Sequence, residues 1–377
     1  MQLFQVFMNL SQIIKYNIMN YKSILYCLLG ITLNVFLSCS KQPATAILPP
    51  DLSMGTWINK SALPSVGSNI NHGRMSAVTF TIEDFAYVGL GTENTGIETN
   101  TKFLSDFWKY DPSNDAWTQI SNFPNGSRIN ATAFSIGDTG YVGLGFNDNT
   151  RKLLNDFIAY IPISNSWQKK ADFSGSPRTL ATGFAINGKG YIGTGGGSYI
   201  NNVVSGSLKD FYEYDPSGDS WKAVNNFPGI SRLGAVTFVY NNIAYILGGR
   251  NISTNSAQVS IVDSYPKDFY SFDGSKWNAL LPVNNEIAGE GKVAFVLDNG
   301  YAYIVGGLSA DRVSTNTTWA YNIKNDQWQK VAPYKGTGSY GSVAFTLNGK
   351  GYVGSGASIN VNGNIDSLTS SFSEFTP

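Results

Sequence analysis

The stretch ATAFSIGDTGYVGLG, residues 131–145, decides the fold because it predicts two short β-strands joined by a tight turn. The first strand covers residues 131–136, Gly137-Asp138 forms the turn, and the return strand around Tyr141 stops at Gly145. Residues 156–160 are expected to form a third strand, and the segment around Trp167 an outer fourth strand. One such stretch therefore indicates a four-stranded antiparallel unit.

The same pattern occurs six times. Its copies are centred on Tyr87, Tyr141, Tyr191, Tyr245, Tyr303 and Tyr352. A period near fifty residues, built from short strands, is typical of a radial array of four-stranded blades. The sequence therefore predicts an all-β, six-bladed β-propeller.

Tryptophans mark the six expected outer strands, at Trp57, Trp117, Trp167, Trp221, Trp277 and Trp328. The last copy stops after its third strand, at Phe375-Thr376-Pro377, whereas the strand around Trp57 has no inner strands before it. We expect this N-terminal outer strand to complete the last blade and close the ring, because an unpaired strand edge would otherwise remain on both sides.

The pairs Gly248-Gly249 and Gly306-Gly307, the recurring Asp-Phe pairs and the Tyr-Asp…Trp endings resemble kelch repeats over residues 56–377. The resemblance implies a kelch-type propeller. Several copies depart from it with Gly-Leu-Gly or Gly-Ser-Gly, and the fifth has Thr318-Trp319 where others have Asp-Phe. Propellers serve in binding, scaffolding and catalysis, so the resemblance determines function less well than fold.

Residues 1–38 are expected to be a targeting segment. Lys22 precedes an apolar run that ends at Ser38-Cys39, which resembles a bacterial lipoprotein signal. The resemblance implies a lipid on Cys39, a lipidated tether at residues 39–55, membrane attachment through that lipid, and a place in the bacterial cell envelope. An uncleaved membrane anchor is the alternative, and Met19 is an alternative start.

The composition excludes several classes of function. The 26 basic and 26 acidic residues cancel and form no basic stripe, so no nucleic-acid partner is expected. Both cysteines, Cys27 and Cys39, precede the repeats, which excludes disulfides and thiol nucleophiles there. With one histidine, His72, the chain lacks the ligands for zinc or for the copper of galactose-oxidase-like kelch enzymes. We expect neither a metal nor a cofactor.

An arginine stands six residues before the inner-strand phenylalanine in the first four copies, as Arg74, Arg128, Arg178 and Arg232. The fifth and sixth copies have Gly289 and Ser339 there. Because inner strands begin at one rim of a propeller channel, these arginines are candidates for binding a carboxylate or another planar anion. The alternative is a structural role, in which they brace neighbouring blades through carbonyls or aromatic faces.

The fifth copy contains Glu286, Glu290 and Lys292 in this region. Glu290 is a candidate general base, or else a counter-charge for the arginines. Tyr340, at the same offset in the sixth copy, is a further candidate for ligand binding. Polar loops are expected on the same rim at residues 92–105, 198–209, 251–267 and 357–370, where binding often occurs.

Three functions fit these features. The first is an exported, lipid-anchored binding protein for a carbohydrate, a small anionic ligand or an envelope protein partner. The second follows from a resemblance to N-acetylneuraminate epimerases, which implies a cofactor-free mutarotase using Arg128, Arg178, Arg232 and Glu290. The third is a structural role in a surface complex.

Overall fold

The computed structural model describes residues 46–65, 73–94, 101–200, 203–254, 260–336, 339–360 and 364–377. Residues 45–377 form one compact unit. The predicted signal segment, Cys39 and His72 lie outside the described residues. Within the described ranges, no helix is both long and apolar enough to cross a membrane.

Six sheets repeat one arrangement, and we number them in chain order. The first contains β4 (Val78–Ile82), β5 (Phe85–Gly89), β8 (Phe107–Asp111) and β9 (Ala116–Ile120). The second contains β10 (Thr132–Ile136), β11 (Thr139–Gly143), β14 (Phe157–Ile161) and β15 (Ser166–Lys169), with the 3-10 turn η1 (Pro162–Ser164) between the last two. The third contains β16 (Thr182–Ile186), β17 (Lys189–Gly193), β20 (Phe211–Asp215) and β21 (Ser220–Val224).

The remaining three sheets follow the same order. The fourth contains β22 (Val236–Tyr240), β23 (Ile243–Leu247), β26 (Phe269–Phe272) and β27 (Trp277–Leu280). The fifth contains β28 (Val293–Leu297), β29 (Tyr301–Val305), β30 (Thr318–Asn322), β31 (Gln327–Val331) and the added strand β1 (Ala46–Ile47). The sixth contains β32 (Val343–Leu347), β33 (Lys350–Gly354), β36 (Phe372–Thr376) and β2 (Thr56–Lys60).

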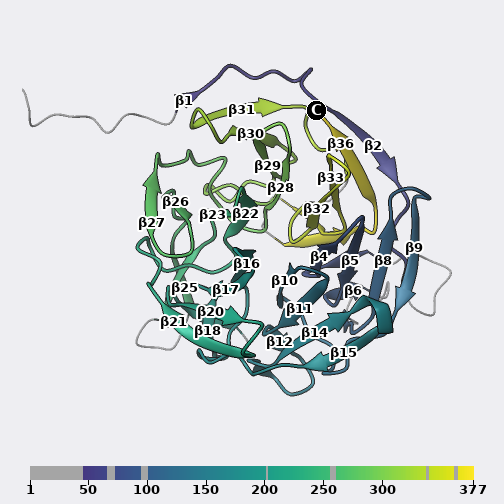
Figure 1. Cartoon of the computed structure of the whole chain (residues 1–377). Coiled ribbons are helices and arrows are strands. Elements are labelled where there is room, and N and C mark those ends of the chain that lie inside the picture. The colour runs from purple at the N-terminus through teal and green to yellow at the C-terminus, as the bar shows by residue number, and fades with distance from the viewer. Residues whose placement is uncertain are drawn as a thin grey trace, which may run out of the picture. The chain divides into compact units, whose positions relative to one another are not determined.

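The first strand of each sheet lies near the centre, and the last lies at the periphery (Figure 1). Each inner strand contacts the inner strand of the next sheet, and β32 contacts β4. This is the all-β propeller architecture that the repeats predict. The recurring aromatics have a cross-strand role, since Phe80 lies opposite Tyr87 and their rings stack 5.0 Å apart.

The strand that contains Trp57 pairs with the last strand of the chain, as the repeat pattern predicts. Trp57 lies opposite Phe375, is buried, and donates a 3.0 Å hydrogen bond from Nε1 to the carbonyl of Ala332 in the fifth sheet. Residues 46–55 differ from the expected tether, because β1 pairs in parallel with β31 and Leu48 N–H donates to Trp328 O. The folded unit therefore begins before Thr56.

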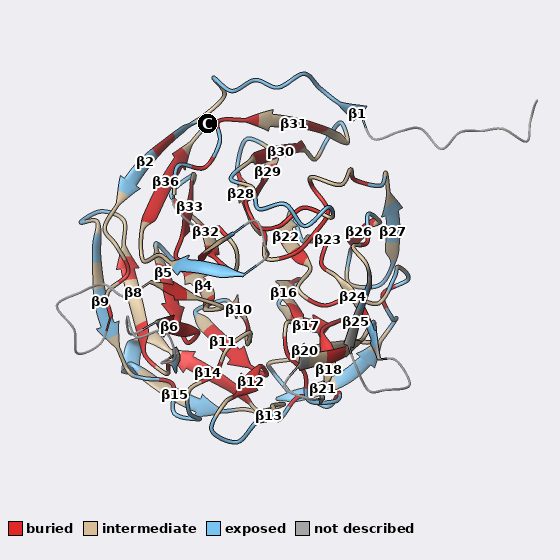
Figure 2. Cartoon of the chain, turned by 180° about the vertical axis from the view of Figure 1, so that it is seen from behind, coloured by how far each residue is buried: buried red, intermediate tan, exposed pale blue. Residues whose placement is uncertain are grey.

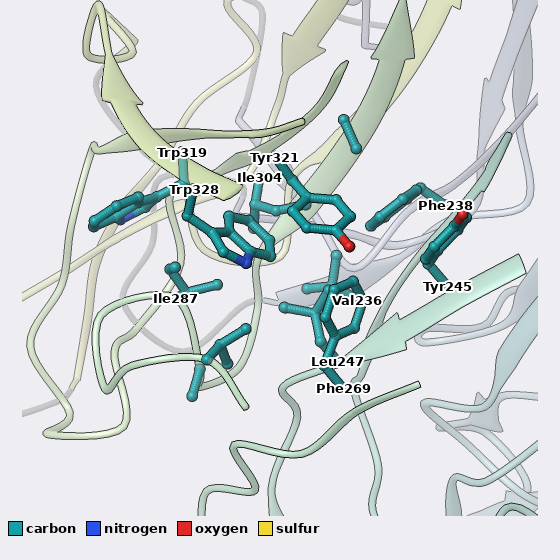
Figure 3. Packing of buried hydrophobic residues seen from close by; sticks show 13 residues of the cluster. Val236, Phe238, Tyr245, Leu247, Phe269, Ile287, Ile304, Trp319, Tyr321 and Trp328 are labelled. Carbon is teal, nitrogen blue, oxygen red and sulfur yellow. The ribbon is translucent and has the colours of Figure 1, made fainter. Parts of the chain in front are cut away.

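The core lies between successive sheets, where buried residues concentrate on the inner strands (Figure 2). The contact between the fourth and fifth sheets is one such cluster, in which Phe269, Tyr321 and Trp328 pack with Ile287 (Figure 3). Each cluster joins side chains of two neighbouring sheets, so packing holds adjacent sheets together.

The four regions predicted as polar loops contain β-hairpins instead. They are β6 (Thr92–Asn94) with β7 (Thr101–Phe103), β18 (Gly196–Ile200) with β19 (Val203–Ser207), β24 (Asn251–Thr254) with β25 (Ser260–Ser264), and β34 (Ala357–Ile359) with β35 (Ile365–Leu368). A shorter pair, β12 (Phe146–Asn147) with β13 (Lys152–Leu153), follows the second sheet's inner strands, and β3 (Arg74–Met75) joins β6. Polar composition concealed these strands, since Asn, Ser, Thr and Gly dominate these segments.

The second glycine of each strand-ending motif links one sheet to the next. Gly91 has φ +88° and donates from its N–H to Arg128 O at 2.9 Å, and Gly145 does the same to Arg178 O. A Cβ on Gly91 would lie 2.5 Å from the carbonyl oxygen of Met75, so only glycine fits. The first glycine of the Gly-Gly pair is less restricted, because Leu90 takes its place in the first sheet. This explains the Gly-Leu-Gly variants.

Candidate functional site

The four repeated arginines are buried and paired within the protein. Arg74 donates from Nη1 and Nη2 to both carboxylate oxygens of Asp106, at 3.0 and 2.6 Å. The corresponding partners are Asp156 for Arg128, Asp210 for Arg178 and Asp268 for Arg232. Each arginine side chain is at most 2% exposed. These pairs, three of which are bidentate, leave little of the guanidinium for a ligand.

Each of these arginines also donates to a carbonyl sixteen residues later, as Arg178 does to Thr194 O at 3.0 Å. Three of them lie over aromatic rings, for example Arg128 over Phe123 with 4.7 Å from Cζ to the ring centroid. Carbonyls and aromatic faces are the contacts of the structural alternative. The expectation that the four guanidinium groups face the channel mouth is therefore corrected: they brace strand ends.

The two sheets without arginine lack the aspartate as well. By strand register, Thr317 in the fifth sheet and Ser371 in the sixth take the place of Asp106, which also corrects the earlier alignment of Thr318-Trp319 with Asp-Phe. The fifth sheet therefore lacks both the arginine, replaced by Gly289, and the aspartate, replaced by Thr317. The asymmetry follows from loss of both members of a pair and requires no ligand.

In the fifth and sixth sheets, other side chains donate to the carbonyl that the arginine contacts in the first four sheets. In the fifth sheet, Lys292 donates from Nζ to Gly306 O at 2.7 Å. In the sixth, Ser342 donates from Oγ to Ser355 O at 3.0 Å. Both residues stand three places before the inner-strand phenylalanine, where the other four sheets have alanine. This shift brings an ammonium and a hydroxyl group to the wall of the channel.

A cavity of about 430 Å³ lies at this end of the channel. The segments before all six inner strands line it, together with hairpin residues such as Phe103 and Val204. Its polar and charged lining includes Asn130, Arg250, Glu290, Lys292, Tyr340 and Ser342. Two predicted site residues, Glu290 and Tyr340, are thus brought together, whereas Arg74, Arg128, Arg178 and Arg232 do not line the cavity.

An ion pair between two sheets occupies one side of this cavity. Arg250, which follows β23, donates from Nη1 to Glu290 Oε1 at 3.2 Å, and its Nε lies 3.1 Å from Oε2. Sequence reasoning identified Glu290 but missed Arg250. Arg250 directly follows Gly248-Gly249, where the second and third sheets have the uncharged residues Phe146 and Gly196. The charge at this position was the signal that could have identified Arg250.

Burial shifts the pKa values of three titratable groups of the cavity in the direction that favours their neutral forms. Burial raises the pKa of Glu290 above its ordinary value, although Arg250 and Arg312 act in the opposite direction. Burial lowers the pKa of Lys292 to about 7, against the effect of Glu286. Burial and then the charge of Glu290 raise the pKa of Tyr340 to about 12, so its hydroxyl remains a donor at neutral pH.

Glu286 does not join this group. Its carboxylate pairs with Lys330 at 2.7 Å. Within the described residues, no cluster of three or more His, Cys, Asp or Glu side chains is arranged to hold a metal ion. The cavity therefore offers a buried carboxyl group, an amine, a guanidinium and a phenol, which suit binding of an anion and transfer of protons.

Comparison with known proteins gives the same architecture. Residues 122–279 match the family described as N-acetylneuraminate epimerase, and residues 293–333 match the kelch motif. The solved structure of YjhT superposes with a TM-score of 0.62 at 19% identity, covering 82% of this chain and 96% of that one. The chain therefore folds as a β-propeller and contains a segment that matches the kelch motif.

Relatives resemble parts of the chain. Kelch-like protein 41a of Danio rerio is 26% identical over 125 residues, 33% of this chain and 19% of that protein. N-acetylneuraminate epimerase 1 of Escherichia coli O6:H1 is 26% identical over 176 residues, 40% of this chain and 47% of the epimerase. The epimerase of Yersinia pestis is 35% identical over 98 residues, 25% of this chain and 24% of the epimerase. The chain thus spans less than half the length of each of these relatives.

Proposed function

We propose that the cavity at the channel mouth binds a small anionic carbohydrate. The observation that carries this proposal is the set of charged groups in its lining, in which two basic residues, Arg250 and Lys292, accompany one carboxylate, Glu290. Amide, hydroxyl and phenol groups from Asn130, Ser342 and Tyr340 surround them and suit a polyhydroxylated ligand. The volume falls in the usual range for small-molecule sites.

Titration calorimetry tests this proposal on the compact unit, residues 45–377. We expect N-acetylneuraminate or a hexuronate to bind, and Tyr340→Ala to weaken binding. The matched control is Tyr240→Ala, because Tyr240 lies at the end of β22 and not in this cavity. Absence of binding by all sugar acids, with capture of an envelope protein at the same rim, would favour a protein partner instead.

A cofactor-free sugar-acid mutarotase is the second candidate. Two observations favour it: the match of residues 122–279 to the epimerase family, and a carboxyl with raised pKa beside an amine whose pKa is about 7. Anomer exchange requires removal of a proton from the anomeric hydroxyl and delivery of one to the ring oxygen, which such groups can perform. In this proposal Glu290 remains an expected acid–base group, Lys292 joins it, and Arg250 takes the place of the arginines in binding the anion.

Anomer exchange followed by NMR tests this candidate. Acceleration by the wild-type protein that Glu290→Gln abolishes and Glu213→Gln retains would support catalysis. A rate equal to that of the buffer, in the presence of saturable ligand binding, would leave a binding protein. Glu213 is the control because its carboxylate pairs with Lys222 in the third sheet, outside the cavity lining.

We further propose that the chain is exported and anchored to the bacterial cell envelope by a lipid on Cys39. The apolar run before Ser38-Cys39 supports this proposal. Mass spectrometry of the membrane fraction should find an acylated N-terminal peptide that begins at Cys39. A Cys39→Ala variant should lack the lipid. An unmodified peptide that extends upstream of Cys39 would contradict the proposal.

A further inference from the structure

A ring of backbone hydrogen bonds surrounds the cavity. Its six residues, one before each inner strand, all have positive φ: Ser76, Asn130, Leu180, Gly234, Gly291 and Gly341. The N–H of Asn130 donates to Ser76 O at 3.2 Å, and that of Leu180 to Asn130 O at 3.0 Å. The bonds Gly234 to Leu180, Gly341 to Gly291 and Ser76 to Gly341 continue the series. Neighbouring sheets are thereby linked around the channel mouth.

The series is interrupted at one junction. Among the described residues, no backbone hydrogen bond joins Gly291 N–H to Gly234 O, so the fourth and fifth sheets lack this link. A second repeated bond is missing at the same junction. Trp117, Trp167, Trp221, Trp277 and Trp57 each donate from Nε1 to a carbonyl of the preceding sheet, whereas the buried Nε1 of Trp328 has no partner in the described structure.

The same junction contains the Arg250–Glu290 ion pair. The bridge position of Glu290 is occupied by Ile129, Thr179, Leu233 and Tyr340 in other sheets, which carry no charge there. The repeat architecture therefore does not require an acid or a base at this place. A buried ion pair contributes little net stability compared with apolar packing, so this departure from the repeat suggests a role in recognition.

At this junction, donors of residues that line the cavity are incompletely satisfied by hydrogen bonds. The Nε of Arg250 is buried and has no hydrogen bond, although it lies near Glu290 Oε2. Gly291, Gly234 and Arg250 all line the cavity. The ring of Tyr340 lies directly against Gly291, where a Cβ would approach its Cδ2 to 2.3 Å. A flat anionic group beside Gly291 would thus have a backbone N–H, a guanidinium and an aromatic ring around it.

Building on the proposed function, we infer that the junction of the fourth and fifth sheets is a carboxylate subsite. The carboxylate of the ligand accepts hydrogen bonds from Gly291 N–H and from Arg250. Glu290, no longer held by Arg250, takes up a proton as the ligand binds, because a second carboxylate beside the largely buried Glu290 carries a high electrostatic cost.

The surroundings of Glu290 fit this proton uptake. The residue is 5% exposed, and its carboxyl group is influenced by Arg250, Arg312 and the hydroxyl of Tyr265, with Tyr340 also near enough to interact electrostatically. The pKa of Glu290 is already raised by burial. Diversion of Arg250 to the ligand raises it further. Binding of a sugar acid should therefore weaken as the pH rises.

The test compares N-acetylneuraminate and glucuronate with their neutral methyl esters, by calorimetry on residues 45–377. The wild-type protein should bind the acids more tightly than the esters and take up a proton, seen as a dependence of the heat on the ionisation enthalpy of the buffer. Arg250→Gln should weaken the acids on the order of tenfold and leave the esters unchanged. Glu290→Gln should tighten acid binding at pH 8 and abolish proton uptake.

Arg250→Gln leaves Glu290 buried without its partner, so the double variant Arg250→Gln/Glu290→Gln serves as a second test. Lys222→Gln, which changes an exposed lysine, is the control. The double variant should bind acid and ester alike. No binding of any probe by the wild type would refute the proposed function itself. Binding of the acids that is indifferent to esterification, or unchanged in the double variant, would refute the carboxylate subsite alone.

Discussion

Lys292 donates a hydrogen bond of 2.7 Å to the carbonyl oxygen of Gly306. In the first four sheets an arginine donates to the equivalent carbonyl. In those sheets the donor comes from six residues before the inner-strand phenylalanine and is neutralised by an aspartate. In the fifth sheet it comes from three residues before, and Lys292 lines the cavity. A structural contact has thereby placed a buried amine in a candidate binding site.

The first prediction concerns the pH dependence of stability. Lys292 has a folded-state pKa of about 7 against 10.5 in the unfolded chain, so between these values only the unfolded chain holds the proton. Raising the pH from 7 to 9 should therefore favour the folded state by about 1.4 kcal/mol per unit from this group. Urea unfolding of Lys292→Met should lack this slope. Lys276→Met, which removes an exposed lysine, should retain it; an unchanged slope in Lys292→Met would contradict the prediction.

The second prediction concerns the bracing pairs. Although burial by itself raises the pKa of Asp210, hydrogen bonds and charge from Arg178 hold it below its usual value. Arg178→Ala should cost about 3–5 kcal/mol because it leaves a partly buried carboxylate unpaired. Arg178→Ala with Asp210→Ala should cost less than the sum of the single changes in a double-mutant cycle.

If Arg178 acted on a ligand, the double variant would lose affinity for sugar acids as well as stability. We expect its affinity to stay within about twofold of wild type, since neither residue lines the cavity. A much larger loss in a folded double variant would restore the ligand-binding role that the sequence suggested for the arginines.

The third prediction concerns Gly91. Because its φ is +88° and its added Cβ would lie 2.5 Å from Met75 O, Gly91→Ala should destabilise the fold by more than about 2 kcal/mol. Gly137→Ala is the matched control, because Gly137 also has positive φ, at +54°, but its Cβ would meet nothing within 4 Å. Thermal unfolding of both variants measures the difference. Equal losses would show that φ alone, and not the link between sheets, decides the effect.

The fourth prediction concerns the N-terminal strand β2. Trp57 is 4% exposed and packs against Tyr334 and Phe375, so Trp57→Ala should cost about 3–5 kcal/mol. Ile58 is 53% exposed on the same strand, and Ile58→Ser should change stability by less than about 0.5 kcal/mol. Chemical denaturation of the two variants separates burial from strand propensity. A small loss for Trp57→Ala would indicate that β2 is dispensable.

The architecture was predictable from sequence because its determinants repeat. Phe134 and Tyr141 form one cross-strand pair, and the same pair recurs at each copy, so six observations support one inference. The pairing of β2 with β36 followed from counting strands around Trp57. The hairpins and the position of β1 were missed, because Asn, Ser, Thr and Gly dominate the hairpin segments and β1 has only two residues.

The site was less predictable. The sequence shows Arg74 in a repeated position but not that Asp106, far along the chain, satisfies it. The simultaneous loss of both partners in the fifth and sixth copies was the available signal. Glu290 and Tyr340 were identified as departures from the repeat, and the structure places both in the cavity. Arg250 was missed because no repeated neighbour marked it.

The pairing of β2 with β36 also has a consequence for biosynthesis. The ribosome makes Thr56–Lys60 well before Phe372–Thr376, so β2 waits for its partner until all six sheets have been synthesised. Until then the nascent chain exposes an unpaired edge that chaperones and proteases can recognise. A prematurely terminated product would keep that edge, which gives the cell a means to distinguish finished molecules from fragments.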